Sequence, residues 1–234
     1  AVGNFVDAIY ESDQLEDGTT VGHRVAIVGF ASKSGYDDNT EILTVTRTVG
    51  SWYPRTTGIP YGDNQEYRDA VEKALVNVRD GEQLNDKLTT AINLLDANGS
   101  TRSDLGMTMA EDILNENPVE AGTERNRVVI MFTDGTPTTN SNFSPSVANG
   151  AIDKSHSLKN TYGATVYTIG VFNDADPYAG IDNTSNENKY MQLVSSNYPN
   201  AKNMDDPGRR AEVEGDGYYL AADSTEELNE IFEA

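Results

Sequence analysis

Residues 127–135 read Arg-Val-Val-Ile-Met-Phe-Thr-Asp-Gly, and this stretch is the strongest indication of the fold class. Its five consecutive apolar residues, 128–132, lie between a charged residue and an Asp-Gly pair. A short apolar run bounded in this way is typical of a strand buried on both faces of a sheet. Asp134 would follow the carboxyl end of that strand, where open α/β sheets place their ligand sites. Asp-Gly after a strand is also a common turn, and for this segment alone a turn is the simpler interpretation.

A second segment, residues 98–106, reads Asn-Gly-Ser-Thr-Arg-Ser-Asp-Leu-Gly and precedes another apolar, helical pattern. It offers hydroxyl oxygens, and hydroxyl and carboxylate oxygens together suit a hard divalent cation such as Mg²⁺. The competing interpretation is structural, because Thr101, Ser103 or Asp104 could simply cap the following helix. Without a partner at Asp134, capping would be preferred.

The two segments resemble the metal loops of von Willebrand factor A domains. Phe-Thr-Asp-Gly at 132–135 looks like the Asp-bearing loop of the family, and Gly-Ser-Thr at 99–101, followed by Gly106, looks like its Thr-bearing loop. The sequences of residues 131–138, 194–199 and 218–222 are similar to the corresponding segments of surface adhesins of Gram-positive bacteria. The resemblance extends from end to end, and implies that Thr101 and Asp134 are metal ligands while Ser103 or Asp104 caps the helix.

The resemblance also implies a fold and a mode of action. The fold would be α/β, with a doubly wound, mostly parallel sheet flanked by helices, in one domain spanning residues 1–234. In the family such loops form a metal-ion-dependent adhesion site that holds Mg²⁺, or Mn²⁺ or Ca²⁺ in its place. Neutral hydroxyl ligands leave the cation partly unneutralised and still hydrated, so that a carboxylate of a partner can complete its coordination. No bond is broken.

One departure from the family concerns its first strand, which carries an Asp-x-Ser-x-Ser motif supplying three metal-contacting side chains. No such motif occurs in this chain. The sequence opens instead on an amphipathic pattern, Val2, Phe5, Val6 and Ile9, which predicts a helix. Either the sequence is truncated, or the missing strand comes from a separate polypeptide, or the site is incomplete. We therefore expect weak metal binding by this chain alone.

Hydrophobic periodicity predicts alternating strands and helices and, with strongly apolar strands, a largely parallel sheet. The expected strands are 24–32, 41–49, 127–133 and 164–171, with a polar hairpin link at 33–40. The expected helical faces are Tyr67, Ala70, Val71, Ala74, Leu75 and Val78; Leu84, Leu88, Ala91 and Leu95; Met109, Ala110, Ile113 and Leu114; a weaker one across 147–158; and a capped last helix at 224–232. Residues 173–216 form a long polar insertion with a short helical candidate at Tyr190, Leu193 and Val194.

Composition narrows the classes of partner. Asp and Glu number 38 against 17 Lys and Arg, which gives a formal net charge of −21. So acidic a surface repels nucleic acid and anionic membranes, and favours cations and basic partners. The chain has no cysteine, which excludes disulfides, thiolate zinc sites and cysteine nucleophiles. No apolar run approaches the length of a membrane span.

The sequence does not predict an enzyme. His23 and His156 are the only histidines, and neither lies beside a Gly-x-Ser-x-Gly nucleophile signature. Phosphate-binding and His-Glu-x-x-His zinc motifs are also missing from the sequence. Paired carboxylates are expected by chance in a chain with this many acids.

Two regions are candidates for contacting a partner. Residues 50–62 gather the only Trp with two Tyr and an Arg, the residue types of binding hot spots, although aromatic residues in Gly/Pro loops more often pack locally. The insertion at 173–216 lies near the edge that holds Asp134, and is the stronger candidate for ligand specificity. Its Asn-Asp-Ala-Asp at 173–176 could hold Ca²⁺ but lacks the spacing of a known calcium loop.

The function that follows from these patterns is a cation-dependent adhesion or protein-binding module. It would be extracellular, in a secreted or cell-wall-attached protein, at a bacterial surface or pilus tip, with a protein or host-surface ligand. The alternative is an intracellular scaffold subunit of a metal-insertion or ATP-driven assembly complex, since A domains also serve there. A signal peptide or wall-sorting motif in the full gene would decide between the two.

Overall fold

The computed structural model describes residues 2–33, 36–96, 99–133, 136–139, 142–213 and 217–222, without the side chains of 32, 33 and 36–39. The helices are α1 (Val2–Ser12), α2 (Gln65–Lys73), α3 (Asp86–Leu94), α4 (Ser103–Glu116), α5 (Pro145–Asn160) and α6 (Asn186–Val194). The strands are β1 (Arg24–Val25), β2 (Val28–Lys33), β3 (Tyr36–Val49), β4 (Arg55–Pro60), β5 (Val76–Asn77), β6 (Arg79–Asp80), β7 (Gln83–Leu84), β8 (Ser100–Thr101), β9 (Val128–Thr133), β10 (Thr165–Gly170) and β11 (Tyr219–Ala221).

The expected mixed α/β class is confirmed, but the strands are divided among several small sheets. The largest has the order β4-β3-β2-β8 and is antiparallel throughout. A second sheet, in the order β11-β10-β9, is parallel. β1 pairs with β5 and β6 with β7 as short antiparallel ribbons. Within the described part of the chain, parallel strand ladders are thus confined to β9–β11, and the expected single, mostly parallel sheet is not confirmed.

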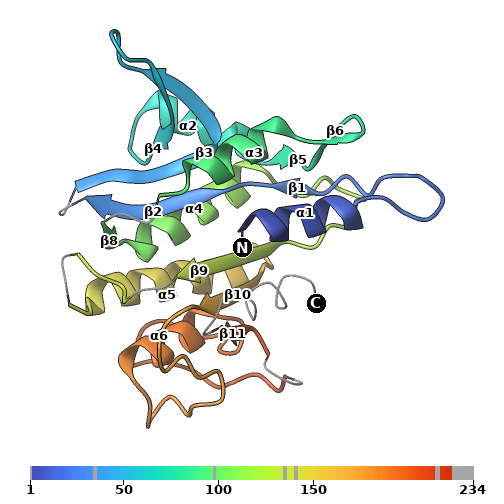
Figure 1. Cartoon of the computed structure of the whole chain (residues 1–234). Helices are drawn as coiled ribbons and strands as arrows, with labels where there is room; N and C mark the ends of the chain where they lie inside the picture. The colour runs from blue at the N-terminus through green and yellow to red at the C-terminus, as the bar shows by residue number, and fades with distance from the viewer. Residues whose placement is uncertain are drawn as a thin grey trace.

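Two helices join the two larger sheets, one on each face (Figure 1). On α1, Val6 lies in a buried cluster with Ile27 from the first half of the chain. Phe5 of the same helix packs in a cluster with Phe132 of β9. The apolar stripe predicted at the start of the sequence is therefore confirmed, and it is shared between the two sheets.

α4 makes the matching connection on the other face. Met109 lies in a buried cluster with Ile42 of β3, whereas Met107, two residues earlier, lies in the cluster that contains Met131 of β9. Neighbouring positions on one helix point to different sheets because successive helical residues are rotated by about 100°. Helices therefore cover both sides of the boundary between β2 and β9.

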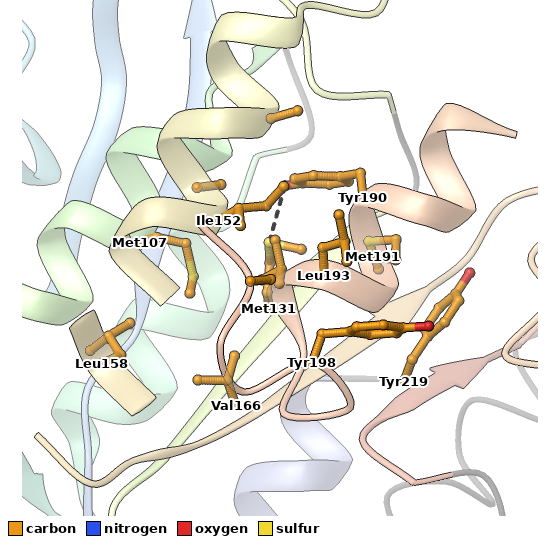
Figure 2. Close-up of a cluster of buried hydrophobic side chains, with 14 of the residues drawn as sticks. Met107, Met131, Ile152, Leu158, Val166, Tyr190, Met191, Leu193, Tyr198 and Tyr219 are labelled. Atoms are coloured by element: carbon orange, nitrogen blue, oxygen red, sulfur yellow. Dashed lines mark hydrogen bonds between the residues drawn. The ribbon is translucent and has the colours of Figure 1, made fainter. Parts of the chain in front are cut away.

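The largest buried cluster lies where α5 and α6 pack on β9 and β10 (Figure 2). Tyr190 of α6 is 1% exposed, and its hydroxyl donates a hydrogen bond to Ser103 Oγ and contacts Met131 Sδ at 3.3 Å. The fully buried members of this cluster include Ala148, Ile152, Leu158, Val166, Met191, Leu193 and Tyr219.

The carboxyl end of α6 is held by a lysine from α5. Lys159 Nζ donates to four backbone oxygens, those of residues 193, 194, 195 and 198, at 2.9–3.3 Å. A cation at the end of a helix satisfies carbonyls that have no partner within the helix. Burial lowers the pKa of Lys159 to about 7, while the four oxygens favour its charged form and oppose that shift.

The segment 173–216 is therefore not a peripheral insertion. Its helical candidate is confirmed as α6, and this helix supplies much of the main core. The sequence on either side of α6 is polar because its Asn and Asp residues make turns. The sequence pattern therefore indicated only a short helix within a polar segment.

Several other helix and strand boundaries differ from those that the periodicity of the sequence predicts. α2 ends at Lys73, so Val78 lies in a bend between β5 and β6, and Leu84 belongs to β7. β3 begins at Tyr36, within the expected hairpin link. The expected last helix at 224–232 lies outside the described residues. Among the helices that are described, none is long and apolar enough to cross a membrane.

Candidate functional site

Thr101 lies at the carboxyl end of β2. It forms β8 with Ser100, and this short strand pairs with β2 through the register Thr101↔Ala31. The next residue, Arg102, donates its backbone N–H to the Phe30 carbonyl at 2.8 Å. Thr101 is therefore fixed by backbone pairing, and its side chain is partly exposed.

The opposite side of Thr101 faces the segment that follows β9. Thr101 N–H donates to Thr138 Oγ1 at 3.2 Å, and Thr138 N–H donates to the Thr101 carbonyl at 3.1 Å. A parallel bridge also joins Thr101 to Pro137. The two segments that sequence analysis singled out thus lie side by side at the carboxyl ends of β2 and β9. Asp134 itself lies outside the described residues.

Two further oxygen-bearing side chains occur at this end of the sheet. Thr136 Oγ1 donates to Glu187 Oε1 at 3.3 Å, and Glu187 lies in the first turn of α6. Glu187 was missed by sequence analysis because α6 was expected as a brief helix within an insertion. Over the part of the chain that is described, there is no group of three or more His, Cys, Asp or Glu side chains arranged to hold a metal.

The start of α4 differs from expectation. The N-cap position is Arg102, which makes no side-chain capping bond, so neither Ser103 nor Asp104 is the cap. Ser103 already lies inside the helix, and its buried hydroxyl accepts the bond from Tyr190. Asp104 forms a two-bond ion pair with Arg102, with both distances 2.9 Å. Its carboxylate still favours the positive end of the helix dipole.

A glycine allows this arrangement. A Cβ at Gly106 would come within 2.9 Å of the Phe30 side chain, so only glycine lets α4 approach β2 this closely. Gly106 was singled out in the sequence as part of the Thr-bearing loop. Its role in the structure is to hold the first turn of α4, and hence Thr101, against the end of β2.

The apolar side chains of β9, which flanks the boundary between the two sheets, are more exposed than those of β10 and β3, which lie further from that boundary. Val128 of β9 is 52% exposed, and Ile130 and Phe132 are only partly buried. By contrast, Val166 of β10 and Ile42 of β3 are completely buried. The expectation that β9 is buried on both faces is therefore wrong along part of its length. Inner strands of an α/β sheet are normally the most buried ones.

β2 and β9 run in the same direction, as Figure 1 shows. Near their starts, Arg125 donates from Nη1 to the Gly22 carbonyl at 2.9 Å. At their ends, Thr101 connects β2 to the residues after β9. Among the described residues, β9 pairs with a strand on one edge only, that of β10. Apart from its two rungs with β8 at Ala31 and Ser32, the outer edge of β2 thus faces the edge of β9 between α1 and α4, and the two strands run parallel.

A separate pocket of about 530 Å³ lies between α2 and α4. Tyr67 donates its hydroxyl to Asp112 Oδ2 at 2.8 Å, and packs edge-on against Tyr61 with ring centroids 5.2 Å apart. Burial raises the pKa of Asp112 above its ordinary value. The carboxylates on its walls, which suit a cationic group, are Asp63, Glu72, Asp112 and Glu116.

Two other groups considered in the sequence make local hydrogen bonds. The loop at 173–176 is fastened by Asn188, which donates Nδ2–H to the Asp174 carbonyl at 2.6 Å and accepts from Asp176 N–H at 2.9 Å. His156 contacts Asn160 on α5.

Comparisons with protein-family models, with curated proteins and with solved structures gave no match to this chain.

Proposed function

We propose that this chain is a cation-dependent adhesion or protein-binding module of a bacterial surface or pilus-tip protein. Thr101 and Asp134 would hold Mg²⁺, or Mn²⁺ or Ca²⁺, and an acidic group of the partner would complete the coordination. The observation that carries the proposal is the backbone pairing of Thr101 with residues 137 and 138. This pairing brings a partly exposed hydroxyl next to residues 137 and 138, which follow Asp134 in the sequence, at the edge where α/β sheets bind ligands.

The chemistry of the described side chains supports a binding role. A threonine hydroxyl is a neutral ligand, so a cation held by one hydroxyl and one carboxylate keeps positive charge and bound water. That charge attracts a carboxylate from a partner, although the chain as a whole carries −21. Glu187, held by Thr136, lies at the same end and can accept hydrogen bonds from metal-bound water.

We further propose that a strand carrying Asp-x-Ser-x-Ser lies between β2 and β9 in the complete site. The support is the pair of facing edges, the partial exposure of Phe30 and Phe132 on those edges, and helices on both faces. Such a strand would be parallel to both neighbours and would give the order β4-β3-β2-strand-β9-β10-β11. That is the doubly wound, mostly parallel sheet of the A-domain family, with the motif at the same end as Thr101.

Metal binding tests both statements. Calorimetry with Mn²⁺ is expected to give weak or undetectable heat for residues 1–234, and clear binding after addition of an apolar strand peptide ending in Asp-x-Ser-x-Ser. Thr101→Val, which keeps the shape but removes the hydroxyl, is expected to abolish the restored binding, while Thr101→Ser keeps it. A peptide with the same residues in scrambled order is the control. Tight binding by the chain alone, abolished by Asp134→Ala, would refute the incomplete site.

Ligand binding tests the adhesion role. An array of matrix proteins and glycans is incubated with the strand-completed protein with and without EDTA. Binding is expected to require the cation and to be lost in Thr101→Val. Because α6 belongs to the core, the contribution of the 173–216 segment is tested with Tyr178→Ala, a 73% exposed position, instead of a deletion. Binding that ignores the chelator would refute the role of the cation.

The intracellular scaffold remains the alternative proposal. It predicts binding to a nucleotide-hydrolysing partner and a gene without export or wall-sorting signals. The adhesion proposal predicts those signals, so the sequence of the full gene distinguishes the two.

A further inference from the structure

The β3–β4 ribbon ends in a loop with unusually exposed aromatic residues. Val49 pairs with Arg55 as the last rung, and residues 50–54 turn between them. Trp52 is 91% exposed and Tyr53 is 90% exposed. Figure 1 shows the ribbon projecting beyond the body of the molecule at its top. We call residues 50–55 the aromatic tip.

Local packing does not account for the aromatic tip. Fully burying a large apolar side chain is worth about 1.5–3 kcal/mol, and neither ring gains this in the folded chain. Among the described residues, the other exposed side chains of this kind, such as Leu15, Val128 and Tyr178, are between 39% and 73% exposed and occur singly. Adjacent Trp and Tyr in water are thus the exception on this surface, and exposed aromatic pairs are typical of binding sites.

The turn constrains the backbone that carries the two rings. Gly50 has φ +90°, and a Cβ there would come within 2.7 Å of the Tyr53 carbonyl oxygen. The chain therefore folds back tightly on itself, in a conformation that favours glycine. Pro54 follows directly and fixes its own φ. A loop constrained in this way loses little conformational entropy on binding.

The charge of the ribbon is opposite to that of the rest of the chain. Residues 42–62 contain no Asp or Glu and two arginines, in a protein with a net charge of −21. Arg47 is paired with Glu66 at 2.6 Å. Arg55, next to the two aromatic residues, is exposed, and its guanidinium has no ion pair with any described residue.

We propose that Trp52, Tyr53 and Arg55 form a docking tip for a protein partner with an apolar pocket flanked by carboxylates. The rings fill the pocket and Arg55 pairs with an acidic group at its rim. Trp, Tyr and Arg are the residues that most often dominate binding energy at protein interfaces. An anionic membrane is disfavoured, because its continuous negative surface repels a body of charge −21. This interaction requires no cation.

The test uses a phage-displayed random peptide library in EDTA, so that its outcome is independent of any metal site. The library is selected on the wild-type chain and counter-selected on the Trp52→Ala/Tyr53→Ala variant. Enriched peptides are expected to combine apolar residues with Asp or Glu. Because Trp52 is the only tryptophan, its fluorescence emission should shift to shorter wavelength when such a peptide binds.

Variants assign the roles of the tip residues. Trp52→Ala is expected to weaken peptide binding by about 30-fold or more, the effect of a hot-spot residue. Arg55→Glu should weaken it comparably, and Arg55→Lys much less. Gly50→Ala keeps all three side chains but disturbs the turn, so it should also weaken binding. Leu15→Ala, which truncates a 50% exposed apolar side chain on another loop, is the control and should have no effect.

Several outcomes would overturn the proposal. These are a selection that enriches nothing over the double variant, and enriched peptides without acidic residues. An emission shift of Trp52 with phosphatidylserine vesicles would assign the tip to a membrane instead, and binding on a glycan array that depends on Trp52 would assign it to carbohydrate. A shift with rising concentration of the chain alone would assign it to a second copy.

Discussion

Tyr190 and Trp52 occupy opposite extremes of burial, although both come from polar sequence interrupted by Asn, Gly or Pro. Tyr190 is 1% exposed and ties α6 to the start of α4, whereas Trp52 is 91% exposed at the aromatic tip. Local composition does not distinguish them. What differs is the element that carries each residue, a helix packed on a sheet in one case and a projecting ribbon in the other. We expect stability to depend on the first region and recognition on the second.

The largest effect is expected at Tyr190. Tyr190→Ala removes a fully buried ring from the main core and should lower the free energy of unfolding by about 3–5 kcal/mol. Tyr190→Phe keeps the ring but leaves the buried Ser103 hydroxyl without its donor, and should cost about 1 kcal/mol. Urea denaturation measures both. Equal losses for the two variants would mean that the hydroxyl, not the packing, carries the contribution.

Lys159 tests the same region through a polar contact. Lys159→Met removes the donor to four backbone oxygens at the end of α6, and should lower the free energy of unfolding by about 2–3 kcal/mol. Lys202→Met is the matched control, because Lys202 is exposed and its nearest carboxylate oxygen, on Asp206, is 3.9 Å away. That control should change stability by less than about 0.5 kcal/mol. Similar values for both lysines would contradict the assigned role.

Asp112 has an intermediate degree of burial, and its contribution to stability depends on pH. Burial raises the pKa of Asp112 in the folded chain above its unfolded value of 3.8. Between the unfolded and the folded pKa of Asp112, the folded state therefore binds more protons than the unfolded state. The contribution of Asp112 to stability is greatest below pH 3.8 and is lost as the pH rises through its folded pKa. Asp112→Asn should leave stability unchanged at acidic pH and raise it near neutral pH. Thermal unfolding at several pH values measures this, and a loss of stability at neutral pH would contradict it.

The smallest effect on stability is expected at the aromatic tip. Trp52→Ala and Tyr53→Ala should each change the free energy of unfolding by less than about 0.5 kcal/mol, because neither ring is buried. The same variants are expected to weaken peptide binding strongly. Destabilisation of both by more than about 1 kcal/mol would show that the rings pack in the folded chain and would end the contrast with Tyr190.

Elements with a continuous apolar pattern could be predicted from sequence. The apolar run at 128–132 and the stripe on α1 were both sufficient to predict a strand and a helix, whereas the burial of β9 also depends on its neighbours and was predicted wrongly along part of its length. α6 was underestimated, since Lys159 meets the Tyr198 carbonyl across 39 positions of sequence and Tyr190 meets Ser103 across 87, and no local pattern reveals such partners. The predicted cap of α4 was wrong for a similar reason, because the Ser103 hydroxyl bonds to Tyr190 instead of capping the helix.

The candidate site was only partly predictable. Sequence singled out Thr101, and the structure brings it to the segment after β9, but its pairing with Thr138 depends on tertiary contacts. Nothing in the sequence indicated that Glu187 contacts Thr136, because its only recognisable feature is a negative charge in the first turn of a helix. Exposure of Trp52 could not be read from sequence either, because a Gly-Pro loop with aromatic residues is compatible with both packing and projection.

The separation of the two sheets has a consequence for how the chain folds. The antiparallel sheet uses residues 28–101 and the parallel one residues 128–222, so each is assembled from one continuous length of chain. Contacts within each part close shorter loops than contacts between them, which favours folding of each part as a unit. Amide hydrogen exchange should accordingly show two groups of protected residues with different opening free energies. α4 contacts both sheets, so its amides should exchange with the less stable group, and the loss of this helix is the event that uncouples the two parts.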